Sequence, residues 1–351
     1  MRDSIHGAMQ KLLDELTSRN DNRVSVFDFQ FKGLDNGTIF LKGKLLDQDQ
    51  LAALEEAFSN HFPSLNLDTN SVQILSRAPH ELVHVATNLT GLYEKPTFGM
   101  ALLSELHYGT ELEVLDEEKR WVFTRQRDGY LGWAYRPYLS KGLASNATHL
   151  VLTPSVELRT EPNSASEIVT RVVSGTGVTI EETFDSWSCI SANKTGWMPS
   201  SALRALTELP QTIEQKRATL IEDSMRMIGV PYLWGGSSGN GIDCSGFARL
   251  LHHWLGIEIP RDADMQYAAA KPVEPPFEIG DLLFFSDGEG KRRITHVGVS
   301  LGGWNMIHSS RRNNGIYIDD LQERQSLKDN FVSAGSFLRQ ITTETSQEGN
   351  A

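Results

Sequence analysis

The pattern of apolar and polar positions changes twice along the chain. Within residues 1–78, stretches with apolar side chains every three or four positions alternate with stretches that have them at every second position. Asp47 or Asp49 stands where the N-cap of a helix is expected. The predicted order is helix, strand, strand, helix, strand, over 1–19, 24–31, 38–46, 47–58 and 71–75. This stretch is therefore predicted to form a small α+β N-terminal domain.

Short strands separated by turn residues fill the next part of the chain, and this part repeats itself. Segments 92–139 and 157–203 each contain a Gly-Thr pair, then a strand with a tryptophan, then a Gly-Trp pair. The matching positions are Gly109-Thr110 and Gly175-Thr176, Trp121 and Trp187, and Gly132-Trp133 and Gly196-Trp197. Such a repeat predicts two small β-barrels in tandem, over 79–145 and 146–208.

From about residue 209 the pattern changes to helices followed by apolar strands. A first helical segment begins after Gln211, and a second follows Cys244. The strand patterns are 282–285, 294–301 and 304–310. Helices first and antiparallel strands afterwards predict an α+β domain over 209–342, followed by a flexible tail over 343–351.

Size and composition limit the choice of function. A chain of 351 residues predicts two to four domains. The 33 Lys and Arg against 45 Asp and Glu give a net charge of −12, which disfavours nucleic acid and anionic membranes as partners. The two cysteines exclude a disulfide scaffold, and neither a metal nor a cofactor is expected. The first residues lack the apolar run of a secretory signal or membrane anchor, which predicts a cytoplasmic protein.

Cys244 stands at the predicted start of a helix, directly after a glycine-rich loop. Apolar side chains that share its face of the helix are Phe247, Leu250, Leu251, Trp254 and Leu255. His252 and His253 fall outside this stripe and are predicted to be solvated. The positive end of the helix dipole favours a thiolate, which predicts a thiol pKa lowered towards about 7. The helix start suits a nucleophile, but a cysteine taken alone is more often a buried, inert core residue, so the choice depends on the motifs around it.

A thiol nucleophile needs a base, and two histidines on neighbouring strands are the candidates. Alternation puts His296 on the same face of its strand as Gly298 and Ser300. A two-residue loop before the next strand would place the two histidines on opposite faces of the sheet. A loop of three or five residues instead pairs Ser300 with Met306, and His308 becomes a diagonal neighbour of His296. We expect the odd loop, with His296 as the base and His308 as the group that orients it.

Five motifs resemble the NlpC/P60 family of papain-like cysteine peptidases, and the tandem repeat resembles bacterial SH3 (SH3b) domains. The motifs are VPYLWGGSSGNGIDCSGF, PRDADMQ, GDLLFF, THVGVSLGG and MIHSS, in the family's order. The fold class implied is multi-domain: an α+β papain-like (NlpC/P60) catalytic domain preceded by two SH3b-like β-barrels and the small α+β N-terminal domain. The resemblance implies that Cys244 is the nucleophile, His296 the general base and acid, and His308 the group that fixes the imidazole tautomer. Tyr232 is implied to support the developing oxyanion. The backbone N–H of Cys244, free in the first helical turn, is a second expected donor.

Two SH3b-like units ahead of such a domain resemble the γ-D-glutamyl-L-diamino acid endopeptidases. This architecture implies a substrate among small murein peptides, such as the tripeptide, with a free N-terminal L-Ala. It implies a role in cell-wall recycling, and both diaminopimelate and lysine stay open as the diamino acid.

The resemblance also implies residues around the substrate. The ammonium group of the alanine requires an acidic pocket, with Asp243 as the expected anion and Ser245 as a hydrogen-bond partner. The other expected contacts are Glu94 and Tyr130 with the alanine, and Arg261 and Asp262 at the border of the cleft.

Three alternatives remain. A metal site built from Cys244, His296 and His308 lacks a fourth ligand in the sequence pattern. An exported endopeptidase that acts on intact peptidoglycan has the same chemistry but needs a leader peptide. A non-catalytic SH3b wall-binding scaffold predicts that Cys244 does not react with thiol labels.

Overall fold

The computed structural model describes residues 2–144, 146–288 and 293–338. The chain divides into two compact units. Unit 1 contains Met1–Val83, Lys95–Thr97 and Glu111–Pro137; unit 2 contains His84–Glu94, Phe98–Thr110 and Tyr138–Ala351. The predicted tail, 343–351, lies outside the described residues. Within those ranges, no helix has both the length and the apolar character needed to cross a bilayer.

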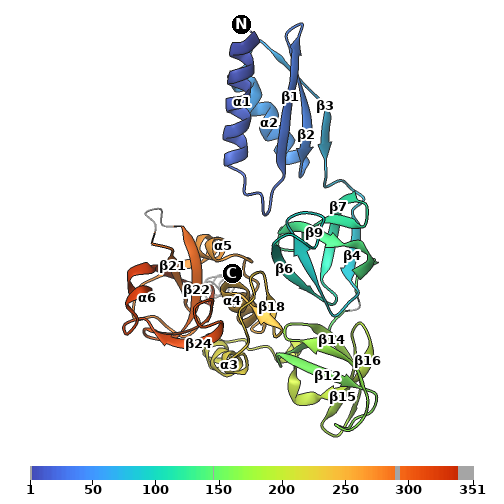
Figure 1. Cartoon of the computed structure of the whole chain (residues 1–351), viewed down its shortest axis with the longest axis vertical. Coiled ribbons are helices and arrows are strands. Elements are labelled where there is room, and N and C mark those ends of the chain that lie inside the picture. The colour runs from blue at the N-terminus through green and yellow to red at the C-terminus, as the bar shows by residue number, and fades with distance from the viewer. Residues whose placement is uncertain (1, 145, 289–292, 339–351) are drawn as a thin grey trace, which may run out of the picture. The chain divides into compact units, whose positions relative to one another are not determined.

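Unit 1 begins with the predicted order of helix, strand, strand, helix, strand (Figure 1). The elements are α1 (Arg2–Ser18), β1 (Phe27–Asp35), β2 (Thr38–Leu45), α2 (Gln48–His61) and β3 (Asn66–Ile74). β1 and β2 are antiparallel across Asn36 and Gly37, which both have positive φ, as a tight hairpin turn requires. β3 lies parallel to β2, so the sheet order is β1-β2-β3.

The core of this layer lies between the two helices and the sheet. Asp47 is the N-cap of α2, and its side chain accepts a hydrogen bond from the backbone N–H of Gln50 at 3.0 Å. Leu12 of α1 and Phe58 of α2 pack with Leu41 of β2 in one buried cluster. The apolar faces of both helices therefore pack against the sheet.

Strands of the first barrel-like repeat belong to both units. In unit 1, β7 (Glu111–Glu118), β8 (Trp121–Gln126) and β9 (Leu131–Tyr135) form an antiparallel meander. In unit 2, β5 (Leu89–Tyr93) and β6 (Leu102–His107) form an antiparallel hairpin. β4 (Glu81–Val85) spans the division, and β10 (Leu139–Lys141) follows in unit 2.

The second repeat forms a seven-stranded antiparallel sheet in unit 2, in the order β13-β12-β16-β15-β14-β11-β17. The strands are β11 (His149–Val151), β12 (Ser155–Arg159), β13 (Ile168–Val173), β14 (Gly177–Phe184), β15 (Trp187–Ser191), β16 (Thr195–Pro199) and β17 (Leu203–Ala205).

The glycines of the two Gly-Thr pairs occupy equivalent places in the two repeats. Gly109 has φ +81°, and its N–H donates to the carbonyl of Val85 at 2.9 Å. Gly175 has φ +82°, and its N–H donates to the carbonyl of Val151 at 2.8 Å. Both positions need left-handed backbone, which explains the recurrence of glycine. The repeat predicted from the sequence is confirmed at these positions.

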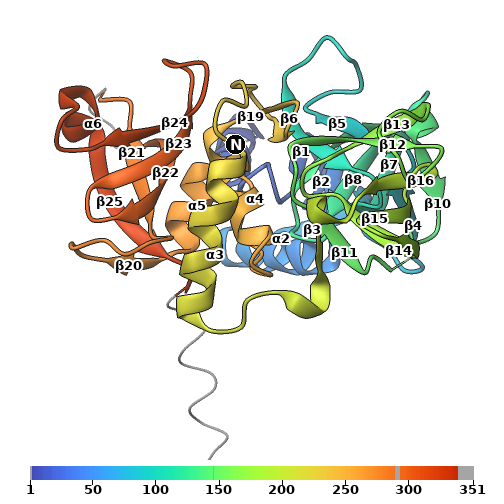
Figure 2. The same ribbon diagram turned by 90° about the horizontal axis from the view of Figure 1, so that it is seen from below.

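The C-terminal part of unit 2 sets helices against a six-stranded sheet in the order β20-β25-β21-β22-β23-β24. The helices are α3 (Ile213–Arg226), α4 (Cys244–His253), α5 (Ala263–Ala269) and α6 (Gln325–Asn330). The sheet strands are β20 (Lys271–Val273), β21 (Leu282–Ser286), β22 (Ile294–Gly302), β23 (Asn305–Ser310), β24 (Gly315–Asp320) and β25 (Phe331–Ser336), and a separate small hairpin is β18 (Ser237–Ser238) and β19 (Gly241–Ile242). α3, α4 and α5 lie along one side of the six-stranded sheet (Figure 2).

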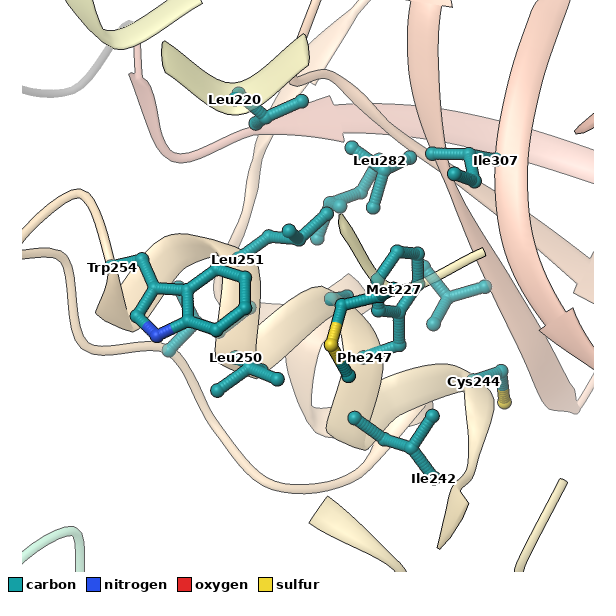
Figure 3. Packing of buried hydrophobic residues seen from close by; sticks show 14 of the residues in the cluster. Leu220, Met227, Ile242, Cys244, Phe247, Leu250, Leu251, Trp254, Leu282 and Ile307 are labelled. Atoms are coloured by element: carbon teal, nitrogen blue, oxygen red, sulfur yellow. The ribbon is translucent and has the colours of Figure 1, made fainter. Parts of the chain in front are cut away.

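Helix α4 is the centre of the core in this part of the unit. Every member of its predicted apolar stripe is buried there, and Cys244 lies at the N-terminal end of the same helix (Figure 3). The prediction that His252 is solvated is wrong, because its side chain is fully buried. Its Nδ1 contacts the carbonyl of Ala248 at 2.8 Å, and its ring packs edge-on against Phe337. The far side of α4 is therefore covered too, by a segment distant in sequence.

Candidate active site

Cys244 is the first residue of α4, as the sequence predicts. Asp243 is the N-cap, and its side chain accepts a hydrogen bond from the backbone N–H of Gly246 at 2.7 Å. Gly246 packs so closely on the preceding loop that an added Cβ would collide with the carbonyl oxygen of Gly236. The Cys244 side chain is 8 % exposed and belongs to the core cluster. The cap and the close loop contact fix the direction in which the thiol points.

The register of β22 and β23 brings His296 and His308 to the same face. Ser300 pairs with Met306, as predicted, but the predicted loop of three or five residues is wrong, because Gly302 pairs with Asn305 and leaves a two-residue turn. Ser300 can pair with Met306 despite the short turn because the register of the two strands shifts between Ser300 and Gly302. His296 Nε2 lies 2.7 Å from His308 Nδ1. The predicted register is confirmed, and the two imidazoles are in direct hydrogen-bond contact.

A carboxylate that the sequence analysis missed continues this chain of hydrogen bonds. Asp319 Oδ2 in β24 lies 2.9 Å from His308 Nε2, and Arg324 contacts Asp319 Oδ1 at 2.7 Å. A carboxylate can only accept, so His308 carries its proton on Nε2 and accepts from His296 Nε2 with its Nδ1. His296 then keeps an unprotonated Nδ1. In the structure His308 pairs with Tyr317, so Asp319, two residues further along β24, is a diagonal neighbour of His308. The sequence signal was therefore an acidic residue in the strand after His308.

The thiol and the imidazole are both held in their neutral forms. Burial raises the pKa of the Cys244 thiol to about 12, and the negative charge of Asp243 adds to this, while backbone N–H groups of Val297 and Ser245 act in the opposite direction. Burial, followed by the neighbouring His308, lowers the pKa of His296 to about 3. The predicted lowering of the thiol pKa by the helix dipole is therefore wrong, because burial outweighs it. The backbone contact with Val297 places the thiol beside β22. Val297 directly follows His296 in the chain.

This electrostatic environment predicts how alkylation of Cys244 depends on pH. Iodoacetamide reacts with the thiolate, so the rate should rise about tenfold per pH unit from pH 6 to 9, without a plateau. The measurement needs a Cys189→Ser background, so that Cys244 is the only thiol in the chain. A plateau beginning near neutral pH would contradict the prediction, because it would indicate a thiolate–imidazolium pair in the resting protein.

Asp243 and Arg261 form a buried ion pair beneath the start of α4. Arg261 Nη2 lies 2.7 Å from Asp243 Oδ2, with side-chain exposures of 1 % and 8 %. Asp243 accepts hydrogen bonds from five donors: the N–H groups of Gly235 and Gly246, the Ser245 hydroxyl, and Arg261 Nη1 and Nη2. This number fills the acceptor sites of a carboxylate. The side chain of Asp243 therefore serves the loop and the helix, and leaves no oxygen lone pair for a substrate ammonium group.

The other predicted substrate contacts lie in different surroundings. Arg261 does not border an open cleft as predicted, because it is buried, and Ser245 is buried with it. Asp262 is partly exposed at the N-cap position of α5, without a side-chain capping bond. Glu94 is exposed after β5 in unit 2, whereas Tyr130 is buried in unit 1 before β9.

Strand β6 supports the loop that leads to Cys244. The Arg261 Nε donates to the Ser104 hydroxyl at 3.1 Å. The backbone N–H of Glu105 donates to the carbonyl of Gly235 at 3.0 Å, and the Glu105 side chain accepts from the backbone N–H of Ser237 at 2.8 Å. Burial raises the pKa of Glu105. Nothing in the sequence spacing signals these contacts, because β6 belongs to the first barrel-like repeat.

Tyr232 lies beside the same loop, as predicted. It forms a parallel bridge with Ile242 and is partly exposed. Burial raises its pKa to about 12, with smaller contributions from the Cys244 thiol and Asp243. The phenol is therefore neutral and within electrostatic range of the thiol, where its O–H is available as a donor. Within the described residues, no group of three or more His, Cys, Asp and Glu side chains has an arrangement that would hold a metal ion.

Comparisons with known families agree with this architecture. Residues 229–335 match the NlpC/P60 family, 154–204 match the bacterial SH3 domain, and 92–134 match the bacterial dipeptidyl-peptidase Sh3 domain. A crystal structure of an NlpC/P60 family protein from Bacillus cereus superposes with a TM-score of 0.63, at 23% identity, over 73% of this chain and 99% of that chain. This likeness establishes the fold.

Sequence similarity to curated proteins extends beyond the NlpC/P60 domain. The γ-D-glutamyl-L-lysine dipeptidyl-peptidase of Bacillus subtilis is 30% identical over 237 residues, 63% of this chain and 76% of the relative. Dipeptidyl-peptidase 6 of Lysinibacillus sphaericus is 25% identical over 278 residues, 72% of this chain and 98% of the relative. The chain therefore belongs to the NlpC/P60 family of cysteine peptidases, with bacterial SH3 domains ahead of the peptidase domain.

Proposed function

We propose that this enzyme hydrolyses the bond between γ-D-Glu and the L-diamino acid of small murein peptides with a free N-terminal L-Ala, in cell-wall recycling in the cytoplasm. The observation that carries the proposal is the hydrogen-bonded line from His296 through His308 to Asp319, with the Cys244 thiol against the backbone of Val297, the residue after His296. The substrate class is supported by the names of the relatives from B. subtilis and L. sphaericus.

The proposed reaction is acyl transfer through a thioester. His296 accepts the proton of Cys244 on Nδ1 while the sulfur bonds to the γ-carbonyl carbon. The backbone N–H of Cys244, which has no intrahelical acceptor in the first turn, and the Tyr232 hydroxyl are the proposed oxyanion donors. His296 then gives the proton to the departing amine as the C–N bond breaks. Water, deprotonated by His296, releases the acyl group and restores the thiol.

Asp243 is not part of the proposed ammonium pocket, because its carboxylate is occupied within the protein. Contacts of Glu94 and Tyr130 with the alanine stay predictions. Alanine substitution of each, assayed against peptides with and without the free amino group, tests them. A residue that binds the ammonium group should matter only for the peptide that carries it.

Mass spectrometry of products from a panel of peptides tests the proposed function. The purified protein should release L-Ala-γ-D-Glu from L-Ala-γ-D-Glu-L-Lys or from its diaminopimelate counterpart. N-acetylation of the alanine should lower kcat/KM, and intact peptidoglycan should be a poor substrate. Efficient release of fragments from intact peptidoglycan would support the exported wall hydrolase instead, and no cleavage of any γ-glutamyl peptide would refute the proposal.

The role of Asp319 predicts a specific kinetic defect in Asp319→Asn. An amide can donate as well as accept, so the tautomers of His308 and His296 are no longer fixed. We expect kcat to fall roughly 10- to 100-fold while KM stays the same. This loss is smaller than the loss when a carboxylate that contacts the catalytic base directly is removed, because Asp319 acts on His296 through His308. Asp320→Asn, the next residue of β24, is the matched control and should keep its activity. Equal kcat in the two variants would remove Asp319 from the proposed machinery.

A further inference from the structure

Arg311 lies in the turn between β23 and β24, close to Tyr232 and Trp234 of the segment PYLWGG, residues 231–236. The start of β24 is bound to that segment by two backbone hydrogen bonds. The N–H of Gly229 donates to the carbonyl of Ile316 at 3.2 Å, and the N–H of Ile316 donates to the carbonyl of Val230 at 3.1 Å. The turn that carries Arg311 is thus held beside Tyr232. Arg311 itself stands three positions after His308 in the chain.

The guanidinium of Arg311 rests on two aromatic rings of that motif. Its central carbon lies 5.6 Å from the centroid of Tyr232 and 4.7 Å from that of Trp234. Both distances are within the range of cation–π attraction. Trp234 is 56 % exposed, and Arg311 is exposed as well. An exposed arginine usually samples many rotamers, but here two rings restrict it, so its charge has a defined place on the surface.

Arg311, unlike Arg324, has no carboxylate partner among the described residues. Arg324 pairs with Asp319 at 2.7 Å, and Arg312 donates to the Ser326 hydroxyl at 3.2 Å. In the part of the chain that the structure describes, Arg311 has no carboxylate within ion-pair distance. Its planar guanidinium, still accessible to solvent, is well suited to bind a carboxylate.

Tyr232 connects this cation to the thiol. The tyrosine lies beside Ile242, two positions before Cys244, and the thiol influences its pKa. A substrate whose carbonyl carbon is at the Cys244 sulfur can therefore present a neighbouring substituent to Tyr232 and, beyond it, to Arg311. In a γ-glutamyl peptide the scissile amide uses the side-chain carboxyl, so the α-carboxylate stays free, a short aliphatic chain away from the reacting carbon.

We propose that Arg311, held over Tyr232 and Trp234, binds a substrate carboxylate next to the scissile γ-amide and makes the enzyme selective for acidic peptides. The inference rests on the proposed function and adds a specificity residue to it. The carboxylate is either the α-carboxylate of the γ-glutamyl unit or that of the diamino acid. Both present the same group to the guanidinium.

Paired substrates and variants test this role. The wild type and Arg311→Gln are compared on L-Ala-γ-D-Glu-L-Lys, on the same peptide with D-isoglutamine in place of D-Glu, and on the peptide with a C-terminal lysine amide. A charge-assisted hydrogen bond predicts that the wild type prefers the acid over one of the amides by about 10- to 100-fold in kcat/KM. Arg311→Gln should reduce this preference to about threefold or less, and Arg311→Lys should restore part of it. The amide that the wild type disfavours identifies the carboxylate.

Arg312→Gln is the matched control, because it removes a positive charge from the same turn. It should keep the wild-type preference. An equal loss by Arg311→Gln on all three peptides would overturn the proposal, because it would mean that Arg311 only supports the aromatic rings. An undiminished acid preference in Arg311→Gln would overturn it as well. Either result leaves wild-type cleavage intact and so differs from failure of the proposed function, in which the wild type cleaves none of the peptides.

Discussion

Cys244→Ala is expected to lose about 10⁴- to 10⁶-fold in kcat on γ-glutamyl peptides, which is the range for removal of an enzyme's nucleophile. The sulfur is the only atom of this side chain that can form the acyl intermediate. The sulfur lies at the start of α4, beside the backbone N–H of Val297. Val297 directly follows His296 in the chain. Removal of one buried atom should cost only about 1 kcal/mol of stability. Product release is measured by mass spectrometry and folding by thermal unfolding.

Two variants define what this loss means. Cys189→Ala removes the other cysteine of the chain, from β15 of the second barrel-like repeat, and should keep full activity. His296→Ala should also be inactive, and the double variant of Cys244 and His296 should be no slower than either single variant, because the pair acts as a unit. Turnover that persists in Cys244→Ala would refute the thioester mechanism.

The sequence was sufficient for the local parts of the site. Helical periodicity and the glycine-rich loop placed Cys244 at the start of a helix, and alternation placed His296 and His308 on one face once the pairing of Ser300 with Met306 was chosen. These inferences succeed because both periodicities are local properties of the backbone. The short turn with an irregular ladder was not foreseen, although it gives the same pairing as the odd loop.

The parts that the sequence analysis missed depend on contacts between distant segments. Asp319 reaches His308 only because β24 joins the sheet, and the buried Arg261 donates to Ser104, a residue of the first repeat. His252 lies off the apolar stripe of α4, yet Phe337 covers it. Periodicity describes one face of a helix and cannot say what packs against the other. The thiol pKa was mispredicted for the same reason, since burial is a tertiary property.

Arg261→Met is expected to destabilise the protein by about 3–5 kcal/mol, because it leaves the Asp243 carboxylate buried without its cation. The guanidinium of Arg261 bonds both oxygens of Asp243 and also reaches Ser104 and Ser245. One substitution thus breaks the link between β6, the loop before Cys244 and the N-cap of α4. Urea unfolding followed by tryptophan fluorescence measures the loss, and activity should fall with it because the same groups fix the start of the helix.

A comparison with an exposed ion pair separates burial from charge. Arg171 pairs with Glu157 at 2.9 Å but is 64% exposed, so Arg171→Met should cost less than about 1 kcal/mol. Asp243→Asn keeps the N-cap acceptor but weakens the ion pair, and in combination with Arg261→Met it should be less destabilising than the sum of the two single changes. If Arg261→Met cost no more than Arg171→Met, the buried pair could not be what holds the loop, and Asp243 would again be available as a substrate anion.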